Sequence, residues 1–304
     1  MVSVKNISKT YGGTVKALRD VSFEVGKGEL FGIIGPDGAG KTTLFRILTT
    51  LILADSGIAT VDGFDVVHDY KKIRTCAGYM PGRFSLYQDM TVEENLTFFA
   101  SVFGTSIQEN YALIEDIYKQ IEPFKKRIAG KLSGGMKQKL ALSCALIHKP
   151  SILFLDEPTT GVDPVSRKEF WEMLKRLKQQ GVTILVSTPY MDEAVLCDRI
   201  ALIRDGQFLK IDTPRQIINQ FSETLWAVSS DQMSKLYTDL QHIQGIKTCF
   251  AFGSSHHVTV DTAQLTMNEL KDRLTGLTHT TIEIIPIEAT IEDCFMAIKS
   301  MNNE

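Results

Sequence analysis

A glycine-rich segment that ends in a lysine and a threonine is the first part of the sequence with residue types suited to chemistry. Residues 35–42 read GPDGAGKT, which fits the spacing G-x-x-x-x-G-K-[ST]. The apolar run before it predicts a buried strand, and TLFRILTTL after it predicts a helix. Glycines let backbone N–H groups approach phosphate oxygens, Lys41 can reach the β- and γ-phosphates, and Thr42 can bind Mg²⁺. The segment therefore predicts a nucleoside triphosphate site.

A pair of carboxylates at the end of a second apolar run would complete such a site. Residues 151–157 read SILFLDE, which places Asp156 and Glu157 at the carboxyl end of a predicted strand. Ligands of open α/β sheets bind at that edge. Asp156 would hold Mg²⁺ through its water shell, and Glu157 would polarise an attacking water as the general base. Two acids after a strand can equally form a surface turn, but together with the glycine-rich loop they predict hydrolysis.

A third segment, LSGGMKQKL at residues 132–140, predicts a second helix start that can bind an anion. Ser133 can cap this helix, and Gly134 and Gly135 leave its N–H groups uncovered. Taken alone, the segment is best interpreted as an ordinary capped helix, so its meaning depends on the two motifs above.

These three motifs, in their order along the chain, resemble those of the nucleotide-binding subunit of ATP-binding cassette (ABC) transporters of the exporter or multidrug type. The resemblance covers about residues 2–220. GPDGAGKTT resembles the Walker A loop, ILFLDE the Walker B strand, LSGGMKQK the family signature and TGVDP the D-loop. It implies an ATPase that uses ATP and Mg²⁺ and powers a separate membrane subunit of an exporter. The site residues that it implies are, for ATP, Tyr11, Gly35, Pro36, Asp37, Gly38, Ala39, Gly40, Lys41, Thr42, Thr43, Ser133, Gly134, Gly135 and Asp163; for Mg²⁺, Thr42 and Asp156; and for catalysis, Glu157.

The resemblance also implies partners. In the family two cassettes face each other head to tail, with each ATP between the Walker A loop of one and the signature of the other, so a homodimer or a heterodimer is expected. Tyr11 falls where the family stacks an aromatic ring on adenine, although such a tyrosine can also be a packing residue. The family docks a helix of the membrane subunit on the helical region, here about residues 84–127. Phe98, Phe99 and Phe103 could line a groove for that helix, or they could be core residues.

Two positions depart from the family pattern. Gly82, in GYMPGRF, stands where the family usually has a glutamine, and Pro189, in VSTPYMDEA, stands where it usually has a histidine. Neither side chain can contact the γ-phosphate or the water, although Arg83 or Gln88 could replace the glutamine. Two interpretations stay open. Either the chain turns ATP over weakly beside a complete cassette partner, or its subgroup hydrolyses ATP well without the histidine.

The elements that must position these residues alternate between short apolar runs and helical stretches, which predicts an α/β fold with a mainly parallel sheet. Residues 2–25 predict an antiparallel β subdomain, and about residues 84–145 a helical subdomain. With the resemblance, residues 1–220 form a P-loop NTPase cassette of the ABC type. Residues 221–304 predict the order β-α-β-β-α-β, which indicates a small α+β ferredoxin-like accessory domain. Its adjacent His256 and His257 should point to opposite faces of a strand and lie at the surface.

Composition narrows the class of function further. The 36 acidic and 33 basic residues give a net charge of −3, which argues against a nucleic-acid partner. No apolar run reaches the about 18 residues that a membrane-spanning helix needs. We therefore expect a cytoplasmic chain, and the resemblance implies that it is peripheral on the inner face of the cell membrane through a membrane subunit. The alternatives are an ATP-binding regulatory cassette with little hydrolysis and a soluble ABC ATPase without a transport role.

Overall fold

The computed structural model describes the backbone of residues 1–301 and the side chains of residues 1–298. Within this part of the chain, no helix is both long and apolar enough to cross a bilayer. The described residues form two compact units, Met1–Pro214 and a second unit that begins at Arg215.

The division between the units falls after Pro214, the first residue of helix α7 (Pro214–Asn219), whereas the sequence predicted a boundary after residue 220. The contacts of α7 explain the difference. Ile217 of this helix is buried, and its carbonyl oxygen accepts a hydrogen bond from Sγ of Cys294 at 3.7 Å. Because Cys294 lies near the end of the chain, the position of α7 depends on a contact that local sequence does not show.

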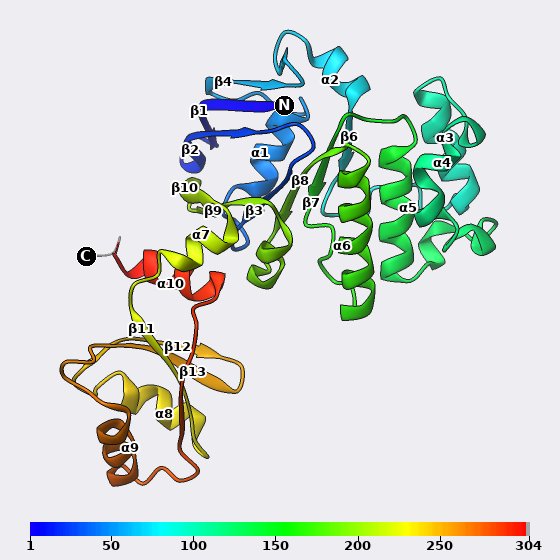
Figure 1. Ribbon diagram of the computed structural model, residues 1–304. Coiled ribbons are helices and arrows are strands. Elements are labelled where there is room, and N and C mark those ends of the chain that lie inside the picture. Colours follow the sequence, from blue (N-terminus) through cyan, green and yellow to red (C-terminus); the bar gives the residue numbers. More distant parts are fainter. Residues whose placement is uncertain (302–304) are drawn as a thin grey trace. The chain divides into compact units, whose positions relative to one another are not determined.

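A six-stranded sheet forms the centre of the first unit (Figure 1). Its strand order is β10-β9-β3-β8-β7-β6. The strands are β3 (Leu30–Ile34), β6 (Ala77–Met80), β7 (Ile152–Asp156), β8 (Thr183–Thr188), β9 (Arg199–Arg204) and β10 (Gln207–Asp212). All neighbours are parallel except β9 and β10. Every residue of β3, β7 and β8 is buried, as expected for parallel strands that are covered on both faces, so the predicted mainly parallel sheet is confirmed.

A four-stranded antiparallel sheet of order β2-β1-β4-β5 forms a subdomain of the same unit. Its strands are β1 (Val2–Tyr11), β2 (Val15–Val25), β4 (Ser56–Val61) and β5 (Phe64–Asp65). Helix α1 (Lys41–Leu48) packs against both sheets, since its Phe45 lies in one buried cluster with Val4 of β1 and Phe154 of β7. The predicted antiparallel subdomain is therefore present, and one hydrophobic core joins it to the central sheet.

Three α-helices between β6 and β7 form the helical subdomain, at the right of Figure 1. They are α3 (Val92–Val102), α4 (Ile107–Tyr118) and α5 (Gly134–Leu146), with the short 3-10 helices η1 (Glu122–Phe124) and η2 (Ala129–Lys131) between them. Each α-helix begins after a hydroxyl side chain that accepts a backbone N–H, as N-caps do: Thr91, Ser106 and Ser133. The unit is completed by α2 (Tyr70–Cys76), α6 (Pro164–Gln179) and η3 (Met191–Leu196), a 3-10 helix.

The second unit has the predicted β-α-β-β-α-β order. Its elements are β11 (Thr224–Ser229), α8 (Met233–Leu240), β12 (Ile246–Phe252), β13 (Ser255–Val260), α9 (Met267–Gly276) and β14 (Glu283–Pro286), followed by α10 (Ile291–Met301). The sheet order is β12-β13-β11-β14, and all pairs are antiparallel. Leucines of α8 and α9 bury themselves against one face of this sheet, around Val228 and Val258.

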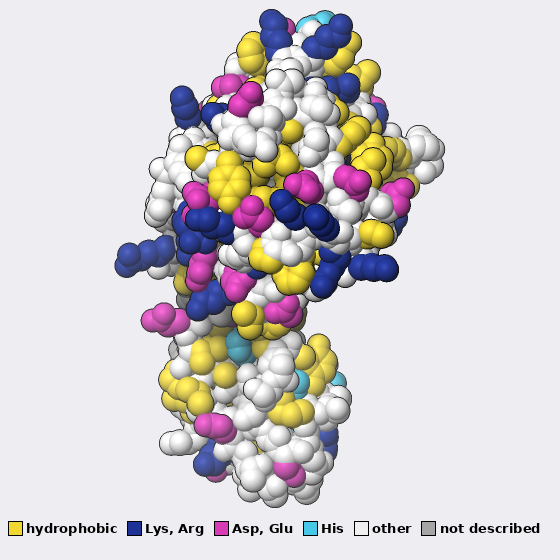
Figure 2. Space-filling model, turned by 90° about the vertical axis from the view of Figure 1, so that its right-hand side faces the viewer, with side chains coloured by type: hydrophobic (Ala, Val, Ile, Leu, Met, Phe, Trp, Pro, Cys, Tyr) yellow, Lys and Arg dark blue, Asp and Glu magenta, His cyan; other side chains and the backbone are white. Residues whose placement is uncertain are grey.

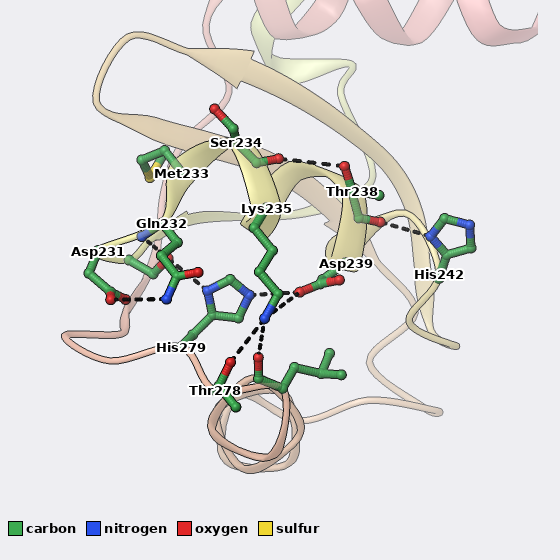
Figure 3. A network of polar contacts seen from close by, with 12 residues as sticks. Asp231, Gln232, Met233, Ser234, Lys235, Thr238, Asp239, His242, Thr278 and His279 are labelled. Atoms are coloured by element: carbon green, nitrogen blue, oxygen red, sulfur yellow. Dashed lines mark hydrogen bonds and ion pairs between the residues drawn. The ribbon is translucent and has the colours of Figure 1, made fainter.

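Three histidines of the second unit are held by polar partners. His256 and His257 point to opposite faces of β13, as predicted, but they are not surface residues. His256 is buried and its Nε2 lies 2.8 Å from the Met233 carbonyl oxygen, while Nδ1 of His257 lies 2.8 Å from Asp293 Oδ1. The prediction of surface histidines is wrong because helices cover both faces at this hairpin. Figure 3 shows the third, His279, whose Nε2 lies 2.8 Å from Oδ2 of Asp239.

Candidate active site

The glycine-rich loop leads from β3 into α1, and two of its glycines are required for different reasons. Gly40 has a φ of 106°, in the left-handed region that favours glycine. A Cβ on Gly35 would lie 2.1 Å from the carbonyl oxygen of Ile203 on the neighbouring strand β9. Gly40 therefore allows the turn, and Gly35 allows the loop to approach the sheet closely.

A cavity of about 450 Å³ lies over this loop. Its lining residues come from the start of β2, the loop, α1, the residue after β7 and the turn between β9 and β10: Thr14, Val15, Lys16, Ala17, Arg19, Gly38, Ala39, Gly40, Lys41, Thr42, Thr43, Glu157 and Asp205. The structure thus brings Lys41, Thr42 and Glu157 together, as the sequence predicted. Lys16 and Arg19 of β2 add positive charge to the lining, and the sequence motifs did not indicate them.

Lys41 connects the loop to the predicted general base. Its side chain is almost completely buried, with 3% of the residue exposed. Its Nζ donates to the carbonyl oxygens of Gly35 at 2.7 Å and Pro36 at 2.9 Å, and lies 3.0 Å from Oε1 of Glu157. A phosphate group that binds Lys41 would compete with Glu157 for the same ammonium group.

The two carboxylates of β7 face different surroundings. Asp156 is 2% exposed, and its Oδ1 accepts a hydrogen bond of 2.7 Å from Oγ of Ser187. Glu157 has a φ of 49°, a left-handed conformation that surrounding contacts must maintain in a residue other than glycine. Its N–H donates to Oγ and to the carbonyl oxygen of Ser187, at 3.1 and 3.0 Å. Ser187, at the end of the adjacent strand β8, therefore orders both acids, although sequence reasoning missed it.

The donor set suits Mg²⁺ bound together with a nucleotide. Thr42 supplies a hydroxyl at the cavity, and Asp156 supplies a carboxylate at the strand end. No cluster of three or more His, Cys, Asp or Glu side chains that could hold a metal by itself is found among the described residues. Mg²⁺ commonly binds through one or two protein oxygens, substrate phosphates and water, so these residues fit it.

The remaining predicted nucleotide contacts lie outside this cavity lining. Ser133 and Gly134 are exposed at the start of α5, and Asp163 is exposed at the start of α6. Asp163 Oδ1 accepts the backbone N–H of Ser166 at 3.0 Å, and this hydrogen bond holds the pKa of its carboxyl below the usual value. Tyr11 is 39% exposed at the end of β1, paired with Val15 of the cavity. On one chain, these groups are therefore presented outward.

The two positions that depart from the family pattern differ in their surroundings. Gly82 lies beside the carboxylate pair, because a Cβ there would be 3.0 Å from the Asp156 carbonyl oxygen and 3.7 Å from Glu157 Cβ. A side chain at this position would therefore reach the acids. Pro189 directly follows β8. Gln88, a candidate substitute, has its backbone carbonyl bonded to Gly130 of the helical subdomain at 2.9 Å.

A second, mostly apolar cavity of about 480 Å³ lies between the helical subdomain and the central sheet. Phe99, Val102 and Phe103 of the α3 region line it, together with Leu51 and Met80. Phe98 packs against Tyr87 instead and does not line it. None of the three phenylalanines is fully buried, so they are not core residues. Figure 2, which faces the helical subdomain, shows exposed hydrophobic side chains among charged ones on the first unit.

The fold and the site together define a P-loop nucleotide-binding protein of the ATP-binding cassette type. A model of the ABC transporter family matches residues 18–160. The chain is 34% identical over 277 residues to DrrA, a doxorubicin resistance ATP-binding protein of Mycobacterium tuberculosis, and this match covers 88% of the chain and 81% of DrrA. The chain therefore belongs to the ABC transporter family, as an ATP-binding protein, which confirms the resemblance.

Two other similar proteins define the extent of the match. YbhF of Escherichia coli, a probable multidrug ABC transporter ATP-binding protein, is 42% identical over 221 residues, which are 71% of the chain but only 38% of YbhF. A dimeric post-hydrolysis structure of the cassette MJ0796, bound to ADP and Pi, superimposes with a TM-score of 0.64 at 27% identity. It covers 70% of the chain and 98% of MJ0796, so the similarity is to a complete cassette.

Proposed function

We propose that the chain hydrolyses ATP and powers a separate membrane subunit of an exporter. One observation carries the proposal: Lys41 of the phosphate loop and Glu157 of the Walker B strand face the same cavity. In that arrangement a nucleotide phosphate on Lys41 would lie next to a carboxylate that can accept a proton from water.

The residues of this chain divide the chemistry between them. Backbone N–H groups of the loop and the start of α1 bind phosphate oxygens, and Lys41 neutralises their charge. Once the phosphate replaces it on Lys41, Glu157 can orient a water molecule and take its proton. Thr42 and Asp156 would hold Mg²⁺, which supplies charge neutralisation at the phosphates when bound. Tyr11 would stack on the adenine ring.

A second cassette would complete the site, as a homodimer or a heterodimer. Ser133 and Gly134 are exposed at a helix start, which is the arrangement that binds an anion from another molecule. At the start of α6, Pro164 and Val165 are also exposed, and 69% of Val165 is exposed. The dimer of MJ0796 supports this proposal by analogy.

The membrane subunit would dock in the apolar cavity beside α3, which would place the chain at the inner face of the cell membrane. Multidrug and doxorubicin resistance names among the relatives support export. Val102→Asp tests this, because Val102 lines the cavity and is 60% exposed. Ile58→Asp is the matched control, since Ile58 is 61% exposed on β4 and lies outside the cavity. We expect only Val102→Asp to release the chain from membranes while ATP binding persists. Equal membrane retention of both variants would contradict the docking site.

A regulatory cassette that binds ATP with little turnover is the second candidate. Gly82 and Pro189 favour it, because neither offers a polar side chain to the γ-phosphate. The Lys41–Glu157 arrangement favours hydrolysis. Measuring MgATP turnover separates the two. A soluble ABC ATPase without a transport role is less well supported, since a net charge of −3 gives the chain no overall positive charge for nucleic acid.

A further inference from the structure

A buried carboxylate four residues after Pro189 lies at the centre of a set of polar contacts. Glu193, on η3, is 2% exposed. Its Oε1 accepts a hydrogen bond of 2.8 Å from Oγ of Thr159, and its Oε2 accepts one from Oγ of Thr188. Nε of Arg167 lies 3.6 Å from Oε1. A buried carboxylate is tolerated when its oxygens are bonded and a cation is near, and both conditions hold here.

The partners of Glu193 belong to three segments, two of which adjoin the carboxylates of the proposed ATP site. Thr159 lies in the turn that follows Glu157. Thr188 is the last residue of β8, directly before Pro189, and its Oγ also accepts the Tyr190 N–H at 3.1 Å. Arg167 lies in the first turns of α6, the helix that Asp163 caps. One side chain therefore ties together the ends of β7 and β8 and the start of α6.

This placement is relevant to the conformation of Glu157. A left-handed φ is strained in a glutamate and persists only where the surroundings fix it. Ser187 fixes the N–H of Glu157 from one side. Glu193 holds the other end of the same turn through Thr159. Pro189 has no N–H to donate, so the segment after β8 depends on side-chain contacts such as Thr188–Glu193.

We propose that Glu193 is a positioning residue that keeps Glu157 aimed at the phosphate site and the turn before α6 in place. The inference rests on the proposed ATP hydrolysis, but its structural part does not require turnover. Glu193 does not line the phosphate cavity, so it acts on the reaction through Thr159 and Glu157. The expected signature is a loss of kcat with little change in the KM for MgATP.

Two variants test the positioning in the full chain. Glu193→Ala removes all three contacts, and Thr159→Val removes one hydroxyl while it leaves the carboxylate with Thr188 and Arg167. We expect kcat to fall about tenfold to a hundredfold for Glu193→Ala, with KM changed less than about twofold. Thr159→Val should show a smaller fall in the same direction. Asp192→Ala is the matched control, because Asp192 also contacts Arg167, at 3.3 Å, but its side chain is 72% exposed. It should leave kcat unchanged.

Hydrogen exchange of the nucleotide-free chain provides a readout that does not depend on turnover. Amides of residues 157–163 should exchange at least about tenfold faster in Glu193→Ala and Thr159→Val, whereas those of β3 stay as in the unaltered chain. If the unaltered chain shows no turnover, the proposed hydrolysis fails, but faster exchange in both variants would still support the positioning role of Glu193. Unchanged exchange in Thr159→Val, or a fall in kcat that Asp192→Ala reproduces, would overturn the inference. Should Glu193→Ala not fold, Thr159→Val decides the question.

Discussion

Nζ of Lys41 lies 3.0 Å from Oε1 of Glu157, so the lysine proposed to bind phosphate and the proposed general base form an ion pair. Lys41 begins α1, after the loop that follows β3, and Glu157 directly follows β7. In the sheet, β3 and β7 are separated by β8. A nucleotide that takes Lys41 would release the Glu157 carboxylate at the moment when its substrate is present. The base is therefore held by the group that the substrate must engage.

Removing the ammonium group of Lys41 should weaken nucleotide binding without unfolding the chain. Lys41→Met keeps the length of the side chain, and we expect the affinity for a fluorescent ATP analogue to fall at least about tenfold, because a charge-assisted hydrogen bond contributes about 1.5–3 kcal/mol. Lys5→Met, at an exposed position of β1, is the control. Equal affinities of the two variants would show that Lys41 does not bind the phosphates.

The signature helix depends on the absence of a side chain at Gly135. A Cβ there would lie 2.6 Å from Oγ of Ser166 on α6, whereas a Cβ on Gly134 would have only the Gly161 carbonyl oxygen near it, at 3.5 Å. Gly135→Ala should therefore destabilise the first unit by about 1–3 kcal/mol, and Gly134→Ala should not. Thermal unfolding followed by calorimetry measures both. Ser166→Gly should restore the stability of Gly135→Ala, and a failure to do so would place the strain elsewhere.

The proline after β8 should limit the rate of hydrolysis. If the missing imidazole is the limiting part, Pro189→His should raise kcat about tenfold or more, because it supplies a hydrogen-bond donor at the position where the family usually has a histidine. Pro189→Ala serves as the control, since it relieves the proline ring without adding a donor. A rate of Pro189→His no higher than that of Pro189→Ala would mean that this chain hydrolyses ATP at its full rate without the histidine.

The buried His279 should stabilise the second unit. Its Nδ1 lies 3.1 Å from Oγ of Ser230, and its Nε2 contacts Asp239 (Figure 3). His279→Leu should reduce the stability of this unit by about 1–3 kcal/mol, because it leaves Ser230 and Asp239 without this partner. His242→Leu, at an exposed position, is the matched control. Hydrogen exchange of β11 and α8 would show the difference, and similar protection in both variants would argue against the role.

Local sequence patterns were sufficient for the parts of the fold and site that depend on neighbours in the chain. The loop before Lys41, the strand that ends at Asp156 and the cap at Ser133 all formed where the sequence predicted them. Parallel strands that are buried on both faces give unbroken apolar runs, which is why β3 and β7 could be predicted from the sequence.

Contacts between distant segments could not be predicted in the same way. Ser187 orders Asp156 because β7 and β8 are adjacent, and Glu193 meets Thr159 because η3 returns to the same sheet edge. A single serine or glutamate gives no periodic signal, so the sequence alone did not indicate either one. The same holds for His257, whose burial depends on α10.

The MgATP turnover of the purified chain, measured beside that of Glu157→Gln, tests the proposed hydrolysis most directly. Both proteins should bind ATP, because Glu157→Gln leaves the phosphate loop intact. We expect measurable turnover that Glu157→Gln lowers at least about a hundredfold, as the loss of a general base does. Tight ATP binding with no turnover above that of Glu157→Gln would contradict it, and would identify the chain as a binding cassette that needs a complete partner for hydrolysis.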